Sequence, residues 1–175
     1  EQMLEADKIL VTVGRRPNSR GLGLEDLGIA TNKSGFFEVD LQRRVLDPKA
    51  GTGLPWLFAI GDVAGQPMLA HKASHEGVVA AEAIAGKKTV FDPRAVPAVI
   101  FTDPEISSVG YTEEQARAKG FDPVVGKFPF AASGRAMALG ETEGFTKIVA
   151  DRKSDVVLGI HIVGPEAAEL AGESV

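Results

Sequence analysis

The sequence predicts a mixed chain in two parts, an α/β part followed by an α+β part built on antiparallel strands. The first observation is the apolar run Trp56–Ile60, which is followed by a helical pattern from Pro67 to Ala85, as in one half of an α/β unit. The second is a series of short strand patterns after Pro93 with a single short helix among them. Charged residues and proline separate the two parts near residues 88 to 96.

Composition excludes several classes of protein. The 175 residues include 19 Lys plus Arg against 24 Asp plus Glu, a net charge of -5, whereas nucleic-acid binders are basic. No apolar run approaches the roughly 20 residues that span a bilayer, and the N-terminus lacks the pattern of a signal peptide. We therefore expect no nucleic-acid or membrane partner and a cytoplasmic location. The chain has no Cys, so it contains no disulfide, thiolate nucleophile or Cys-ligated zinc.

The elements of the first part are expected in the following order. Residues 8 to 13 form a buried strand that needs neighbouring strands, and Phe36–Asp40 form a second strand after a turn-rich stretch. A loop at 47 to 55 leads to the strand Trp56–Ile60. Pro67 suits the first turn of the next helix, which ends at Gly86. Its broken apolar stripe consists of Met68, Leu69, Ala73, Val79, Ala80, Ala83 and Ile84.

The second part contains the clearest local signals. Thr112 and Gln115 have the spacing of a capping box, which predicts a helix at 113 to 119 that ends at Gly120. Arg152–Asp155 lie between two apolar runs and predict a hairpin connection. The expected strands are 98–101, 106–109, 124–130, 145–150 and 156–163.

Both ends of the sequence predict that the chain is a piece of a longer protein. The apolar run of residues 9 to 13 is unlike the start of a domain, and the helical pattern from Glu166 stops after about two turns without a C-cap. Ala167, Leu170 and Ala171 share one side of that last helix, and we expect this side to be uncovered.

Asp62 and the helix start after it are the candidate ligand-binding features. Gly61 and Asp62 follow the strand Trp56–Ile60 directly, where open α/β sheets bind ligands, so Asp62 is a candidate acceptor for a sugar or ribityl hydroxyl. The alternative is that Asp62 only organises its own turn. Met68, Leu69 and Ala70 are expected in the first helical turn, where amides favour a partly negative oxygen. The alternative there is an ordinary solvated helix start.

Other chemistry finds little support in the sequence. His71 and His75 have the i, i+4 spacing of a zinc pair, but Lys72-Ala73-Ser74 between them lacks the metalloprotease glutamate and no third ligand is evident, so we expect no metal site. His161 lies within an apolar strand and is expected to be a structural residue. No nucleophile triad is present, and Gly21–Leu24 lack the pattern of a phosphate loop. We therefore expect no catalytic residue in this segment.

Several sequence blocks, taken in order, resemble the flavin-dependent pyridine nucleotide-disulfide oxidoreductases. The downstream blocks are similar to the dihydrolipoamide dehydrogenases, the E3 components of 2-oxo acid dehydrogenase complexes. The resemblance covers essentially the whole chain. The blocks that carry it are Val13–Asn18, Ala59–Val63, Met68–Ala73, His75–Gly77, Phe101–Glu105, Val109–Gly110, Ala131–Ala136, Gly144–Lys147 and Gly159–Pro165.

This resemblance implies a fragment of an FAD-binding Rossmann-like domain followed by an interface, or dimerisation, domain. It implies that residues 1–14 end an NAD-binding domain, 15–94 complete the FAD-binding domain and 95–175 form a truncated interface domain. It further implies FAD and NAD as cofactors, dihydrolipoamide as substrate, a homodimer, and the E2 acyltransferase as partner. The cofactor-contacting positions that it implies are Gly14 beside the nicotinamide nucleotide, Asp62 at the ribityl chain, and Met68, Leu69 and Ala70 at the flavin's pyrimidine edge. Gly61 and His71, which adjoin these positions, are implied as further cofactor-binding residues.

The departures from the family pattern limit what this chain does alone. In the family, the redox-active Cys pair and the FAD-binding GxGxxG lie upstream of the matching segment and the His-Glu proton-transfer pair lies downstream, so we expect the isolated chain to be inactive. The stretch Leu46–Pro55 is longer and richer in Gly than the family pattern. Two alternatives stay open: a non-catalytic dimerisation or interaction module, and a glutathione- or mercuric-reductase-type enzyme, although Ser133–Ala136 favour the lipoamide enzyme. The sequence leaves open whether the chain alone binds flavin.

Overall fold

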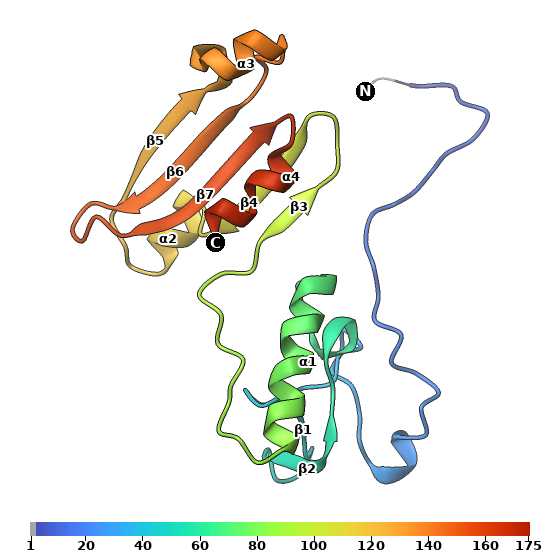
Figure 1. Cartoon of the computed structure of the whole chain (residues 1–175). Coiled ribbons are helices and arrows are strands. Elements are labelled where there is room, and N and C mark those ends of the chain that lie inside the picture. The colour runs from blue at the N-terminus through green and yellow to red at the C-terminus, as the bar shows by residue number, and fades with distance from the viewer. Residues whose placement is uncertain (1–2) are drawn as a thin grey trace. The chain divides into compact units, whose positions relative to one another are not determined.

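The computed structural model describes residues 3–175, which divide into two compact units (Figure 1). One unit runs to Asp92 and the other from Pro93 to Val175, and each is described by itself. The first unit contains the short helices η1 (Glu25–Leu27) and η2 (Gly61–Ala64), the strands β1 (Arg44–Leu46) and β2 (Gly53–Phe58), and the helix α1 (Ala70–Ile84). The second unit contains β3 (Ala98–Ile100), β4 (Glu105–Gly110), α2 (Glu113–Ala118), β5 (Pro123–Pro129), η3 (Phe130–Ala132), α3 (Gly134–Leu139), β6 (Phe145–Asp151), β7 (Val157–Gly164), α4 (Ala167–Leu170) and η4 (Gly172–Ser174).

The first unit is built on an antiparallel pair followed by a helix. Strands β1 and β2 pair with each other, and Val39 adds an isolated bridge to Val45. The buried core of this unit consists of Ile29, Phe37, Val45 and Ala59. The prediction of a strand followed by a helix is confirmed in β2 and α1.

Three strand predictions in this unit need correction. Residues 8 to 13 form no strand, and Ile9, Leu10 and Val13 are 85%, 88% and 92% exposed, because no described segment pairs with their backbone. Phe36–Asp40 form only the bridge at Val39, since their hydrogen bonds go to turns as well as to β1. Strand β2 begins at Gly53, inside the predicted loop, and ends at Phe58 because the chain turns into η2.

Helix α1 differs from its prediction at its start and on its buried face. It begins at Ala70 rather than Pro67, because Leu69 is still extended (φ -129°, ψ 136°). Its end is confirmed: Gly86 has φ 82° and its amide donates to the Ala83 carbonyl. The buried face contains Lys72 and Glu76 together with Val79 and Ala80, so it is not the purely apolar stripe that the sequence predicts.

The second unit is an antiparallel sheet with the strand order β3-β4-β7-β6-β5, which confirms the α+β prediction (Figure 1). The five strand predictions agree with the observed strands to within two residues at each end. The alternation of side chains buries Val109, Val149 and Ile162 in the sheet.

The predicted capping box at the start of α2 is confirmed. The Thr112 hydroxyl accepts a hydrogen bond from the Gln115 amide at 3.2 Å, and the Gln115 side chain accepts one from the Thr112 amide at 3.0 Å. The predicted hairpin at Arg152–Asp155 joins β6 to β7. Hydrogen bonds from the Ser154 hydroxyl and from the Asp122 amide hold the pKa of Asp151, at the base of this hairpin, below its usual value.

Two helices of the second unit depart from the sequence analysis. Helix α3 is absent from the predictions, since it has six residues and begins with a glycine; the Ser133 hydroxyl caps it and Gly140 ends it. The side of α4 expected to be uncovered is largely buried: Ala167 and Ala171 are 0% and 6% exposed and Leu170 is 42% exposed. The reason is that α4 packs on β4, where the Glu105 carboxylate accepts a hydrogen bond from the Ala168 amide. Among the described residues, no helix is both long and apolar enough to cross a membrane.

Candidate functional site

The candidate site is formed by the turn after β2 and the start of α1. The turn η2 begins at Gly61, whose φ of +72° is a conformation that other residues rarely adopt. A Cβ at this position would lie 3.1 Å from the Cβ of Ala73, so the turn packs directly on the second turn of α1. This close approach brings Asp62 next to the N-terminal end of the helix.

Asp62 presents an accessible carboxylate. Its side chain is 47% exposed, and Arg15 lies beside it with an Nη1–Oδ2 distance of 3.9 Å. Within residues 3–175 its carboxylate accepts no hydrogen bond from the backbone of its own turn. The oxygens are therefore available to hydroxyl donors, as the ligand-binding prediction requires. Arg15 was not singled out in the sequence analysis, and Gly14 precedes it directly in the extended segment that leads to the site.

Helix α1 begins later than predicted, so fewer of the predicted residues lie in its first turn. Met68 and Leu69 lie before the helix, because their amides donate to Gln66 Oε1 (3.2 Å) and to the Pro67 carbonyl (3.1 Å) within their own turn. Placing them in the first helical turn was wrong. The first turn begins with Ala70 and His71, and no side-chain hydrogen bond caps the helix at Leu69.

A buried charged cluster supports the turn and the helix start from beneath. Glu76 is 0% exposed, and its Oε2 accepts a hydrogen bond from the Gly61 amide at 2.7 Å. Its Oε1 lies 2.9 Å from Arg43 Nη1 and 3.0 Å from Lys72 Nζ. Lys72 also donates to the Gly65 carbonyl at 3.1 Å. Glu76 and Lys72 thus hold both ends of the segment that carries Asp62.

These three charged residues were not predicted from the sequence as part of the site. A signal for two of them exists, because Lys72, Glu76, Val79 and Ala80 follow the i, i+4, i+7, i+8 spacing of one helix face. Arg43 has no such signal: its guanidinium stacks 4.8 Å from the Phe91 ring centroid, a contact between residues far apart in the sequence.

The histidines have separate surroundings. His71 and His75 both lie on the exposed face of α1. The His75 ring packs edge-on against the Phe91 ring, with 4.9 Å between the ring centroids. Among the residues that the structure describes, no three His, Cys, Asp or Glu side chains are grouped to hold a metal ion. His161 is hydrogen-bonded on both nitrogens, to the Ser108 hydroxyl at 2.7 Å and to the Tyr111 carbonyl at 3.1 Å, as expected of a structural residue.

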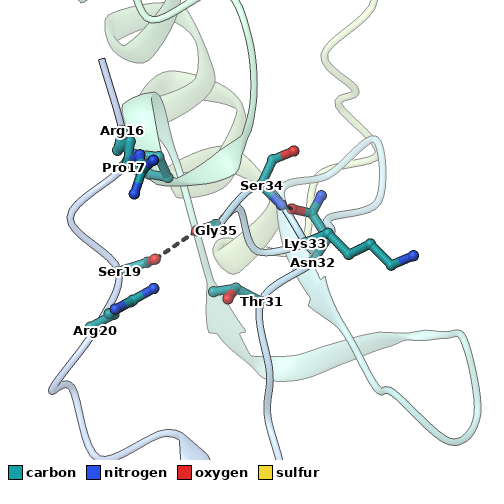
Figure 2. A pocket seen from close by; sticks show the side chains of 9 residues that line it. All are labelled: Arg16, Pro17, Ser19, Arg20, Thr31, Asn32, Lys33, Ser34 and Gly35. Carbon is teal, nitrogen blue, oxygen red and sulfur yellow. Dashed lines mark hydrogen bonds between the residues drawn. The ribbon is translucent and has the colours of Figure 1, made fainter. Parts of the chain in front are cut away.

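A cavity of about 590 Å³, separate from the turn of Asp62, lies between the segments 16–20 and 31–35 of the first unit (Figure 2). Its lining includes Arg16, Arg20 and Lys33. Figure 2 shows Lys33 directed away from the two arginines, and the Ser19 hydroxyl donates to the Gly35 carbonyl. Because the cations do not converge and the buried hydroxyl donor is already used, this cavity has no organised anion site.

Comparison with known proteins gives consistent matches for both units. Residues 1–77 match the family model described as pyridine nucleotide-disulphide oxidoreductase, and residues 96–175 match the model of the dimerisation domain of the same family.

Curated relatives and solved structures agree with these models. Dihydrolipoyl dehydrogenases of Geobacillus stearothermophilus and Halobacterium salinarum are 52% and 53% identical, over 97% and 99% of this chain. The chain spans 35% of the length of each of these relatives. Among solved structures, LpdA from Mycobacterium tuberculosis is 32% identical with a TM-score of 0.78, over 93% of this chain and 34% of that one. The flavoprotein disulfide reductase RclA from Escherichia coli is 31% identical with a TM-score of 0.76, over 92% and 36%.

Proposed function

Because the chain belongs to the pyridine nucleotide-disulphide oxidoreductase family, we propose that it is part of a dihydrolipoyl dehydrogenase. The whole enzyme reoxidises dihydrolipoamide with NAD through FAD and a redox disulfide, as the E3 component of a 2-oxo acid dehydrogenase complex. The single observation that carries this proposal is the identity of about half of all positions with dihydrolipoyl dehydrogenases over nearly the whole chain. The share of this chain is to complete the FAD site and to contribute the dimerisation domain.

The residues of the candidate site fit FAD in two respects. The half-exposed Asp62 carboxylate has free acceptor capacity for a ribityl hydroxyl. The start of α1, which no side chain caps, provides a positive dipole end for the electron-rich pyrimidine edge of the flavin. In this proposal Ala70 and His71 face that edge, Met68 and Leu69 line it, and Gly61 allows the turn that presents Asp62. Gly14 adjoins the nicotinamide nucleotide.

In this proposal the residues of this chain position the flavin and stabilise charge on it, and none of them reacts with the substrate. When bound, FAD would supply a two-electron carrier between the dithiol and NAD. Asp62 holds the ribityl chain by accepting a hydrogen bond, which fixes the ring in position. The start of α1 favours negative charge at the ring edge. The chain has no Cys, so the redox disulfide is supplied by another part of the enzyme.

The partners in this proposal follow from the same assignment. Residues 95–175 pair two subunits into a homodimer, and the dimer binds the E2 acyltransferase, whose lipoyl group is the source of dihydrolipoamide. Residues 15–94 complete the FAD-binding domain, and residues 1–14 end the NAD-binding domain. The proposal includes a cytoplasmic location, which agrees with a chain free of Cys.

Replacing Asp62 tests its cofactor role. In the full-length protein, Asp62→Ala leaves a ribityl hydroxyl without its acceptor and should weaken FAD binding by about 1.5–3 kcal/mol, or about tenfold to a hundredfold. The measurement is the dissociation constant of FAD by fluorescence titration of the apoprotein. Asp26→Ala, at the exposed helix η1, is the matched control. An unchanged dissociation constant for Asp62→Ala would show that Asp62 does not bind FAD and only organises its own turn.

Association of the chain tests the dimerisation role. We expect the 175-residue chain to form a concentration-dependent dimer, because a domain shaped for a large interface keeps an apolar surface that pairs rather than faces water. On β5 and β6 such side chains include Val125, Phe128 and Ile148, which are 42%, 52% and 40% exposed. Sedimentation velocity over a wide concentration range measures the association. A monomer at the highest concentration would show that this chain does not carry the interface.

The alternative, a non-catalytic dimerisation module, is distinguished by colour. A flavoprotein purified with its cofactor absorbs visible light, whereas a module without FAD does not. We expect the full-length protein to be yellow. A full-length protein that is colourless, and that stays so after incubation with FAD, would favour the module.

A further inference from the structure

The buried cluster of Arg43, Lys72 and Glu76 contains more positive than negative charge. The side chains of Arg43, Lys72 and Glu76 are 10%, 4% and 0% exposed. Both cations reach the same carboxylate oxygen, at 2.9 and 3.0 Å. Within residues 3–175, no second carboxylate lies within 4.0 Å of either cation. The cluster therefore keeps one uncompensated positive charge out of water.

Lys72 is the less favourably placed of the two cations. It is the third residue of α1, where the helix dipole is positive, so its ammonium group is repelled by the helix that carries it. Burial adds the cost of removing an ammonium group from water. The partners of the ammonium group are the Gly65 carbonyl at 3.1 Å and the Glu76 carboxylate at 3.0 Å, which Lys72 shares with Arg43. The helix dipole and burial therefore both make the charge of Lys72 unfavourable. We take this as an indication that a negative charge from outside residues 3–175 interacts with Lys72 in the working protein.

The cluster lies under the candidate flavin site. Glu76 accepts from the Gly61 amide and Lys72 donates to the Gly65 carbonyl, so the two side chains bracket the turn of Asp62. Lys72 also follows Ala70 and His71, the residues at the start of α1. The exposed carboxylate of Asp62 is paired with Arg15 and not with Lys72.

We propose that the uncompensated charge of Lys72 stabilises the negatively charged reduced flavin relative to the neutral oxidised flavin, and thereby raises the reduction potential. This inference rests on the proposed function, since it requires FAD at the Asp62 turn. Lys72 acts through its electric field, without touching the reacting atoms. The effect is differential, because a charge interacts more strongly with the charged redox state than with the neutral one.

The test compares Lys72→Met with wild type in the full-length, FAD-loaded protein. This substitution removes the excess charge and leaves the neutral pair of Arg43 and Glu76, so the protein should remain folded and retain FAD. At one fixed potential, set with a redox dye, we expect the ratio of reduced to oxidised flavin to fall about tenfold, which is about 30 mV for two electrons. Lys72→Arg keeps the charge and should keep the wild-type potential.

Lys87→Met is the matched control, because Lys87 is 65% exposed and is paired with Glu82 near the other end of α1. An unchanged potential in Lys72→Met, or an equal shift in Lys87→Met, would overturn the inference. Loss of FAD from Lys72→Met would also overturn it, since Lys72 would then hold both redox states. A wild-type protein that takes up no FAD would instead refute the proposed function.

Discussion

The 175-residue chain alone is expected to catalyse no NAD-dependent oxidation of dihydrolipoamide above background. In the proposed enzyme, electrons pass from a dithiol to FAD through a protein disulfide, and this chain contains no Cys. Binding interactions cannot replace the missing redox group, so the loss should be complete rather than partial. Formation of NADH from dihydrolipoamide, followed by absorbance, is the measurement.

The full-length protein, assayed in parallel, is the positive control for this experiment. The mass of the 175-residue preparation must be verified, because traces of a longer enzyme would give turnover. NADH formation by a preparation of the verified mass would contradict the assignment of the redox step to another part of the enzyme.

Removal of the Glu76 carboxylate is expected to cause the largest loss of stability. In the full-length protein, Glu76→Ala leaves Arg43 and Lys72 buried without their counter-ion and the Gly61 amide without its acceptor. Breaking a buried ion pair from one side costs about 3–5 kcal/mol of unfolding free energy. Urea denaturation, followed by fluorescence and circular dichroism, measures this change.

Two further variants show whether the cause is the unpaired charge. Glu82→Ala is the matched control on the same helix, since Glu82 pairs with exposed Lys87 and its loss should leave the urea midpoint unchanged. Adding Lys72→Met to Glu76→Ala removes one of the two stranded cations and should recover part of the loss. Equal midpoints for Glu76→Ala and wild type would show that the cluster contributes nothing to stability.

The second unit could be predicted closely from its residues. The Thr112–Gln115 capping box and the turn Arg152–Asp155 depend on neighbours within a few positions, and both occur as predicted. The strands β4 to β7 have short apolar runs bounded by turn residues, and each finds its partner within the same unit. Local hydrogen bonds and side-chain periodicity therefore suffice to specify this sheet.

The first unit shows the limit of such patterns. Residues 8 to 13 have the composition of a buried strand, yet a strand exists only where a second backbone accepts its hydrogen bonds, and no described segment does so. The start of α1 was predicted too early, because Met68 and Leu69 use their amides in the preceding turn.

Some residues of the candidate site were likewise predictable from the sequence, and others were placed only by the tertiary structure. The position of Asp62 after a strand and before a helix is a matter of order along the chain, so the sequence alone indicates it. The burial of Lys72 and Glu76, and their meeting with Arg43, were decided by tertiary structure. Charged side chains normally face water, and a fully buried carboxylate such as that of Glu76 needs cationic partners. Lys72 is a partner from the same helix, whereas Arg43 comes from a distant segment. Such a partner lies 33 residues from Glu76 along the chain, beyond the reach of any local pattern.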